Sequence, residues 1–257
     1  MIKRILFGIF IAFFASVSHA QTETINWYNE DGTLYTTTTC ESGGDIVLPT
    51  APTKFGYTFT GWRPYTPIEY LRNTGTQWIN TNYIPNQNTR IKAKVKFNTN
   101  SNNEGSVFGS GVSYSSQTFE LYLWNRQIEF NYNNDYTQSS QLIQNGDILI
   151  IDWNKNIINY SINGITQPEI VRPYGQFSSP YPMGLFCNIR SQNPTPNMTG
   201  KIEIYYFQIY DDDVLVRDFI PVLDTGNNIP CLYDNVTNQF FYNAGTGDFV
   251  AGPVINE

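Results

Sequence analysis

The stretch Arg90–Phe97 reads RIKAKVKF, in which apolar and basic residues alternate without a break. Strict alternation is the pattern of a β-strand that has one face in a core and the other in water. The lysine face is interpreted as a solvated face or as the face of an edge strand, and a stripe that attracts polyanions is the alternative.

Short segments of the same kind, separated by turn residues, fill the chain from residue 65 to residue 257. Asn163-Gly164 is a strong hairpin signal, and no convincing amphipathic helix is present, although Pro67–Asn73 could form one turn. Many short strands with turns between them indicate an all-β, antiparallel β-sandwich or jelly roll. The expected strands are Arg90–Phe97, Thr118–Trp124, Gln127–Tyr132, Asp147–Trp153, Ile157–Ile162, Ile165–Thr166, Met183–Cys187, Lys201–Tyr210, Val214–Ile220 and a final hairpin at Leu232–Tyr242.

The first twenty residues have the features of a secretory signal peptide. Lys3 and Arg4 precede the apolar run Ile5–Ala15, and Ser18-His19-Ala20 supplies small residues at a cleavage point. We expect cleavage between Ala20 and Gln21, and a mature protein that is secreted, held at the cell surface or periplasmic, with no membrane insertion.

Removal of the signal peptide limits which catalytic and metal sites the mature protein can form. The chain has one histidine, His19, so the mature protein has none, which excludes the usual Ser-His-Asp and His-zinc sites. The net charge of the chain is −7, and no cluster of basic residues suits a nucleic acid. Aromatic residues (16%) outnumber charged ones (14%), as in exported β-proteins and in surfaces that bind hydroxyl-rich ligands.

Residues 21–64 form a separate small module in this interpretation. A hairpin is expected from Thr24–Tyr28 and Thr33–Cys40 around Asp31-Gly32, and a third strand at Ile46–Leu48. Together with the motif GYTFTGW, which ends at Trp62, this segment resembles part of the Listeria–Bacteroides repeat of internalin-type proteins, a small β-grasp-like module. The resemblance implies that the three rings of the motif, Tyr57, Phe59 and Trp62, fill the core of the module.

Three segments of the larger part carry a second resemblance. They are YLRNTGTQWINTNYIPNQNTRIKAKVKF, GKIEIYYFQIYDDDVLVRDFIPV and LYDNVTNQFFYNAGTGDFVAGP. They are similar to the laminin-G-like, concanavalin A-like lectin-glucanase jelly rolls. Members of that group include lectins, carbohydrate-binding modules, adhesive domains and some glucanases, so the resemblance leaves the activity open.

A glucanase of this fold would need paired carboxylates on one strand, as Glu-x-Asp-x-x-Glu. Glu120, Glu129 and Glu203 instead stand alone, and Asp152 is interpreted as a hydrogen-bonded structural carboxylate. The run Asp211-Asp212-Asp213 is interpreted as a solvated turn. We therefore expect no catalysis and no cofactor, and only a calcium ion bound by loop oxygens stays open.

The strand pair 118–132 carries the residues predicted to bind a ligand. Its alternation assigns Phe119, Leu121, Leu123, Ile128 and Phe130 to the core. Tyr122, Trp124 and Asn131 then lie on a polar outer face, next to a loop that contains Tyr132, Asp135 and Tyr136. Aromatic rings among amides and hydroxyls suit sugars, so a polysaccharide or glycoconjugate is the expected partner. The alternatives are burial of Tyr122 and Trp124 against a loop or the small module, and adhesion to a surface protein.

Three cysteines, Cys40, Cys187 and Cys231, cannot all pair within one chain. Cys187 and Cys231 both fall in the larger part and could form a disulfide.

Overall fold

The computed structural model describes residues 3–5, 9–10, 22–29, 33–53, 55, 57–59, 61–98, 105–112, 116–190 and 201–255. The predicted cleavage point after Ala20 and the turn at Asp31-Gly32 lie outside these residues. All regular elements of the described residues are strands, and no helix among them is long and apolar enough to cross a membrane. The protein is therefore all-β, as the sequence predicts.

The chain divides into two compact units. The smaller contains residues Met1–Ile68, Val222–Ile229 and Pro253–Glu257, and the larger contains Glu69–Pro221 and Pro230–Gly252. The chain thus leaves the larger unit after Pro221, passes through the smaller unit at Val222–Ile229, and re-enters the larger unit at Pro230. Within the smaller unit, the last residues of β21 (Val214–Asp224) pair with β6 (Tyr65–Pro67).

The smaller unit contains a three-stranded sheet in the order β2 (Ile9–Phe10), β3 (Thr22–Tyr28) and β4 (Leu34–Glu41). Separately, β1 (Lys3–Ile5) pairs in parallel with β5 (Tyr57–Phe59). Both β1 and β2 fall within the predicted signal peptide, whose removal stays a prediction.

The predicted third strand at Ile46–Leu48 is wrong, because these residues have no regular structure and are exposed. Pro49 and Pro52 follow directly and lack the N–H groups that a ladder needs. The ring of Trp62 packs against that of the fully buried Trp27, with centroids 4.6 Å apart. This contact confirms a packing role for Trp62, whereas the side chains of Tyr57 and Phe59 are outside the described set.

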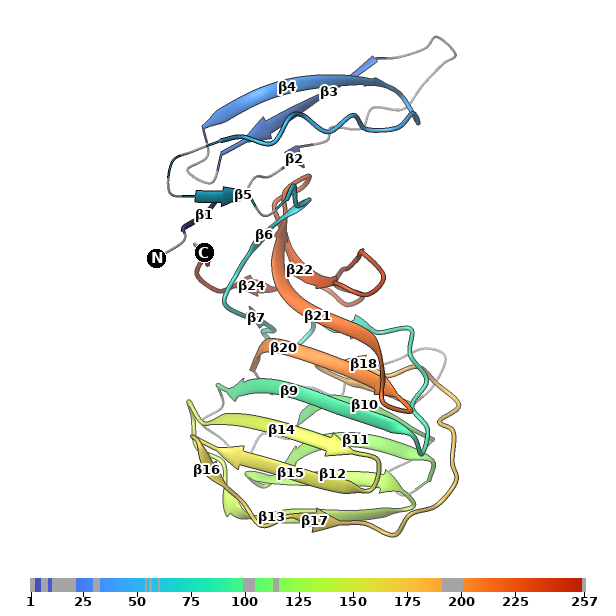
Figure 1. Ribbon diagram of the computed structural model, residues 1–257. Helices are drawn as coiled ribbons and strands as arrows, with labels where there is room; N and C mark the ends of the chain where they lie inside the picture. Colours follow the sequence, from blue (N-terminus) through green and yellow to red (C-terminus); the bar gives the residue numbers. More distant parts are fainter. Residues whose placement is uncertain are drawn as a thin grey trace. The chain divides into compact units, whose positions relative to one another are not determined.

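The larger unit is a sandwich of two sheets (Figure 1). One sheet has seven strands, with β19 (Asn188–Ile189) also paired to β10. Its order is β13 (Asp135–Leu142), β12 (Gln127–Asn133), β11 (Thr118–Trp124), β10 (Gly105–Ser110), β18 (Gly184–Leu185) and β8 (Ile79–Asn80).

The other sheet has twelve strands, and several of its members are not neighbours in sequence. Its main path is β16 (Ile165–Thr166), β15 (Ile157–Ile162), β14 (Ile148–Asn154), β9 (Thr89–Phe97), β20 (Ile202–Asp211), β21, β22 (Ile229–Asp234) and β23 (Gln239–Phe241). The short strands β6, β7 (Leu71–Arg72), β17 (Ile170–Val171) and β24 (Val250–Ala251) join it off this path. The predicted helical turn at Pro67–Asn73 is wrong, because this stretch contributes β7.

The core lies between the two sheets and is dominated by aromatic rings. Trp153 on β14 is fully buried and stacks on Phe119 of β11, with ring centroids 4.5 Å apart. Phe108 on β10 meets Phe207 on β20 edge to face at 5.2 Å. Rings from both sheets therefore interdigitate, and the backbones of the strands above them are held in fixed positions.

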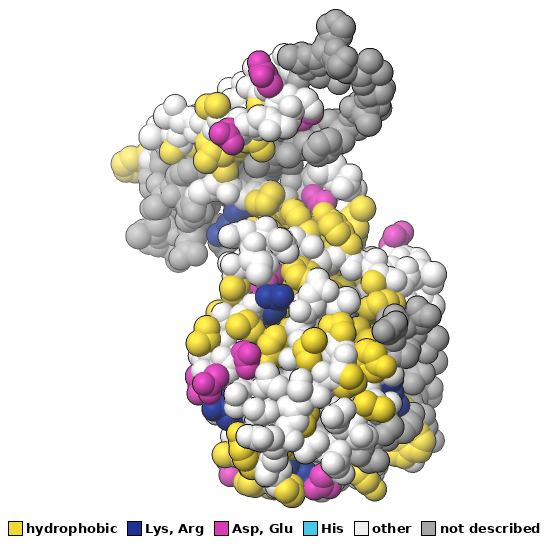
Figure 2. All heavy atoms as spheres, turned by 90° about the vertical axis from the view of Figure 1, so that its right-hand side faces the viewer, with side chains coloured by type: hydrophobic (Ala, Val, Ile, Leu, Met, Phe, Trp, Pro, Cys, Tyr) yellow, Lys and Arg dark blue, Asp and Glu magenta, His cyan; other side chains and the backbone are white. Residues whose placement is uncertain are grey.

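Figure 2 shows one side of the molecule, on which apolar and uncharged polar side chains of the larger unit are interspersed and charged ones are few. The surface thus reflects the low content of charged residues.

Candidate functional site

The β11–β12 hairpin carries four of the residues predicted to bind a ligand: Tyr122, Trp124, Asn131 and Tyr132. Asn125 and Arg126 have φ angles of 46° and 67°, as a tight two-residue hairpin turn requires. The five residues predicted for the core of this hairpin are all buried. The side chains that alternate with these five lie on the outer face of the seven-stranded sheet, where Tyr122 is directly opposite Glu129 and Trp124 is opposite Gln127.

Tyr122 and Trp124 form a stacked pair on this outer face. Their ring centroids are 6.3 Å apart and their planes differ by 26°. Trp124 is 38% exposed, whereas Tyr122 is only 5% exposed. The burial alternative therefore holds for Tyr122, and Trp124 is the accessible member, supported from one side by the tyrosine ring.

Tyr136 adds a second accessible ring to the same face. It lies on β13 directly opposite Asn131, so the two share a face, and it is 57% exposed. In the row between Trp124 and Tyr136, the Gln138 amide donates to the Glu129 carboxylate at 3.1 Å. Two exposed rings thus flank an amide and a carboxylate.

The expected loop at residues 132–136 is wrong, because it is part of a β12–β13 hairpin in which Tyr132 pairs with Asp135. The side chain of Tyr132 follows Phe130 on the core face and contacts Phe119 and Phe177. Asp135 is exposed and forms an ion pair with Arg172. The alternation Ile128, Phe130, Tyr132 indicates the burial of this tyrosine, whereas the pairing of Asp135 with a residue 37 positions away cannot be derived from local sequence.

Asn131 is fully buried, so it does not present its amide to solvent in this structure. Its Nδ2 donates to the carboxylate of Glu120 at 3.2 Å, and Arg190 Nη2 lies 2.9 Å from the same oxygen. Ser106 also donates to Glu120, which is itself fully buried. The sequence suggested an isolated glutamate on the surface; the structure shows a buried ion pair with a hydrogen-bonded shell.

The possible disulfide between Cys187 and Cys231 is not formed, and both residues are free, buried cysteines. Cys187 follows β18 of the seven-stranded sheet, whereas Cys231 lies on β22 of the other sheet. Burial, and to a lesser degree the charge of Glu120, raise the pKa of the Cys187 thiol well above its ordinary value. A thiol of this kind is inert packing.

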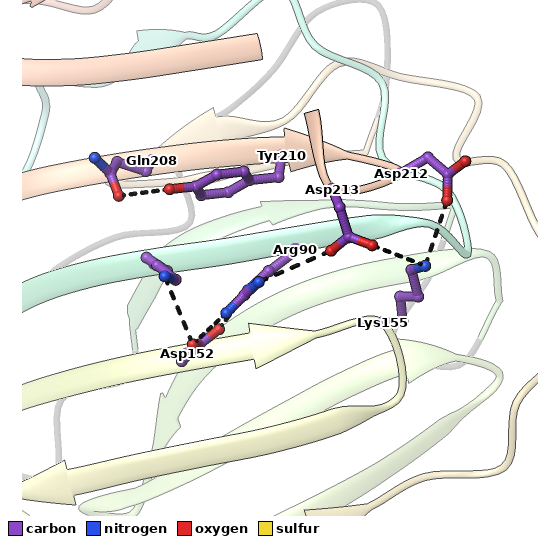
Figure 3. A network of polar contacts seen from close by, with 8 residues as sticks. Arg90, Asp152, Lys155, Gln208, Tyr210, Asp212 and Asp213 are labelled. Atoms are coloured by element: carbon purple, nitrogen blue, oxygen red, sulfur yellow. Dashed lines mark hydrogen bonds and ion pairs between the residues drawn. The ribbon is translucent and has the colours of Figure 1, made fainter. Parts of the chain in front are cut away.

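The outer face of the twelve-stranded sheet carries a network of ion pairs (Figure 3). Arg90 binds Asp152 with two hydrogen bonds, of 2.8 and 2.7 Å, which raise the pKa of the arginine. The predicted turn at Asp211-Asp212-Asp213 is confirmed, with positive φ at Asp212 and Asp213. Lys155 lies 3.4 Å from Asp212 and 3.6 Å from Asp213.

These pairings bear on the calcium and glucanase alternatives. The carboxylates of Asp212 and Asp213 are already compensated by cations, and the described residues contain no group of three or more side chains arranged to hold a metal ion. Glu203 is buried beside Lys96 at 3.2 Å and accepts a hydrogen bond from Tyr205. Of the carboxylates considered for catalysis, Glu120, Asp152 and Glu203 are partners of cations, whereas Glu129 accepts a hydrogen bond from Gln138.

Known proteins give little further guidance. No protein-family model matches the chain, and no curated protein matches its sequence. One similar solved structure is a Bacteroides ovatus protein described as a "putative carbohydrate binding protein", with 8% identity and a TM-score of 0.48 over 95% of this chain and 72% of that one. Another is the botulinum neurotoxin serotype D binding domain, with 13% identity and a TM-score of 0.33 over 81% of this chain and 43% of that one. What this chain does therefore has to be inferred from its own residues.

Proposed function

We propose that this is an exported, non-catalytic protein that binds a polysaccharide or glycoconjugate on the outer face of the seven-stranded sheet. The observation that carries the proposal is the exposed indole of Trp124, stacked on Tyr122 and separated by the Glu129–Gln138 pair from the exposed ring of Tyr136. Aromatic faces bind the apolar faces of pyranose rings, and amide and carboxylate groups between them bind hydroxyls.

The exposure of the individual side chains supports a specific set of sugar contacts within this proposal. Trp124 and Tyr136 offer their faces, and Glu129 and Gln138 offer polar atoms between them. Tyr122 acts indirectly, because it is buried and keeps the indole of Trp124 in place. Holding an aromatic side chain before the ligand arrives reduces the conformational entropy lost on binding.

The test is a glycan array with the exported chain, residues 21–257, followed by titration of the best ligand. Trp124→Ala should weaken binding about tenfold or more, since each tenfold corresponds to about 1.4 kcal/mol. The matched control is Tyr242→Ala, which removes another half-exposed aromatic side chain from the β23 end of the larger unit. It should leave the affinity unchanged.

Two results would refute the proposal: no binding to any glycan by the folded protein, or equal affinity of Trp124→Ala and wild type. Such a result would favour adhesion to another protein. The observation in favour of that second function is the exposed apolar stretch of the smaller unit, Ile46, Val47 and Leu48, followed by the exposed Phe55.

A further inference from the structure

The lysine strand of the sequence, β9, is an internal strand. It is hydrogen-bonded to β14 on one side and to β20 on the other. Lysines on an edge strand prevent aggregation, but an internal strand has no free edge to protect. The outward side chains of β9 are half-buried rather than fully solvated. The two simplest interpretations of the lysine face therefore do not describe this strand.

The neighbouring strand surrounds these lysines with tyrosines. A β-bulge between Ile204 and Tyr206 shifts the register of β20 against β9. Tyr206 lies directly opposite Lys94, and the ammonium group of Lys94 is 4.4 Å from the centre of the Tyr205 ring. The bulge thus brings two consecutive tyrosines to one lysine.

A third tyrosine lies further along the same face. The ammonium of Lys92 and the guanidinium of Arg90 are each 5.6 Å from the centre of the Tyr210 ring. The hydroxyl of Tyr210 donates to Gln208, which is opposite Lys92 (Figure 3). We call Lys92, Lys94, Tyr205, Tyr206 and Tyr210 the lysine–tyrosine face.

Lys92 and Lys94 are weakly neutralised by carboxylates. Asp152 is bound by both arms of Arg90, and Lys92 approaches the same carboxylate only to 4.0 Å. Within the described part of the chain, Lys94 has neither an ion pair nor a hydrogen bond, only its contact with the Tyr205 ring. Arg90 also has a second carboxylate partner, Asp213, at 3.8 Å. Lys92 and Lys94 are therefore the least neutralised cations of the face, on alternate residues of one strand and so about 7 Å apart along it.

We propose that the lysine–tyrosine face is a second binding site, independent of Trp124, and that it takes an acidic polysaccharide. Carboxylate groups of the polymer would pair with Lys92 and Lys94, while the tyrosine rings and hydroxyls contact the sugar rings. A nucleic acid fits less well, because its affinity depends on neutralising many phosphates and this face offers two lysines.

The probe is polygalacturonate, a polymer of uronate units, with dextran as the neutral comparison. Wild-type protein should bind polygalacturonate, should bind dextran at least tenfold more weakly at this face, and should lose affinity as salt is added. Lys94→Gln should lower the affinity for polygalacturonate about fivefold. The double variant with Lys92→Gln and Lys94→Gln should no longer bind polygalacturonate. Lys201→Gln is the matched control, because it removes the same charge from an exposed position of the larger unit.

Three outcomes would overturn the inference. The first is no binding of polygalacturonate. The second is an equal loss for Lys94→Gln and Lys201→Gln, which would show a general charge effect. The third is equally tight binding of duplex DNA that is lost in the same variants, which would show a plain polyelectrolyte surface. Trp124→Ala should bind polygalacturonate like wild type, so failure of the Trp124 proposal and failure of this one give different results.

Discussion

Tyr132 fits the hydrophobic pattern of its strand, but the burial of its hydroxyl lowers the stability of the folded protein. Its ring contacts Phe119, Trp153 and Phe177, but its hydroxyl is buried and has no hydrogen-bond partner among the residues that the structure describes. A buried hydroxyl without a partner has lost its hydrogen bonds to water and forms none within the protein, so it lowers the free energy of unfolding. Burial also raises the pKa of Tyr132 to about 12.

Replacing this tyrosine by phenylalanine should therefore stabilise the protein. Tyr132→Phe should raise the free energy of unfolding at pH 7 by about 1 kcal/mol, measured by urea denaturation. The unfolded state ionises near pH 10 and the folded state only near pH 12, so the wild type should lose stability as the pH rises between about these values. Tyr132→Phe should lack this contribution to the loss.

The control for this comparison is Tyr136→Phe, whose hydroxyl is on an exposed side chain and whose removal should have little effect. A Tyr132→Phe protein less stable than wild type would mean that the hydroxyl is hydrogen-bonded, for instance to water, and would contradict the expectation.

At the same scale, the ion pair of Glu120 could not be predicted from the sequence. Its neighbours on the strand, Phe119 and Leu121, reveal that it points away from the core, and the sequence shows no more than that. Its ion-pair partner Arg190 is 70 residues away. A buried carboxylate requires a partner of opposite charge, but which of the basic residues supplies it depends on the pairing of distant strands.

At the scale of elements, hairpins were the most predictable features. The β14–β15 and β22–β23 hairpins and the turn at Asn163-Gly164 occur as expected, because turn residues and alternation act over a few positions. The strands β10 and β13 were not predicted. Their sequences, GSVFGS and DYTQSSQL, contain small and polar residues without alternation, so only their neighbours in the sheet identify them as strands.

The turn between β15 and β16 can be used to test whether turn residues determine a hairpin. Asn163 and Gly164 have φ angles of 52° and 78°, and a Cβ atom added to Gly164 would contact nothing within 4 Å. Gly164→Ala should therefore destabilise the protein by about 1 kcal/mol, through backbone conformation and not through a clash. Gly164→Asn should cost less, because asparagine tolerates positive φ.

Thermal or urea unfolding of the two variants is the measurement. Equal losses for alanine and asparagine would argue against a conformational cause. No loss in either variant would mean that the two-residue strand β16 adds nothing to the stability of the sheet.

At the scale of the whole molecule, the order of strands could not be predicted. The two central strands of the twelve-stranded sheet, β9 and β20, come from residues more than 100 positions apart, and β10 pairs with β18 rather than only with its successor. Alternation specifies which face of a strand is buried, but it does not specify the neighbour. The functional consequence is large, because the lysine–tyrosine face exists only through the contact of β9 with β20.

The division into two units leads to the last prediction, which concerns hydrogen exchange. Strand β9 has partners on both sides and a fully alternating buried face, whereas β4 has no buried residue and, among the described strands, pairs with β3 alone. Amides of β9 should therefore exchange at least about tenfold more slowly than those of β4, a difference of about 1.4 kcal/mol or more in opening free energy.

Mass spectrometry of the exchanged protein should also reveal the return of the chain to the smaller unit. Val222–Ile229 belongs to that unit although it lies between two segments of the larger one. If the smaller unit opens by itself, amides in this stretch should exchange together with β4 and faster than those of β20. Exchange of Val222–Ile229 at the slow rate of β20 would instead show that the two units open as one cooperative body.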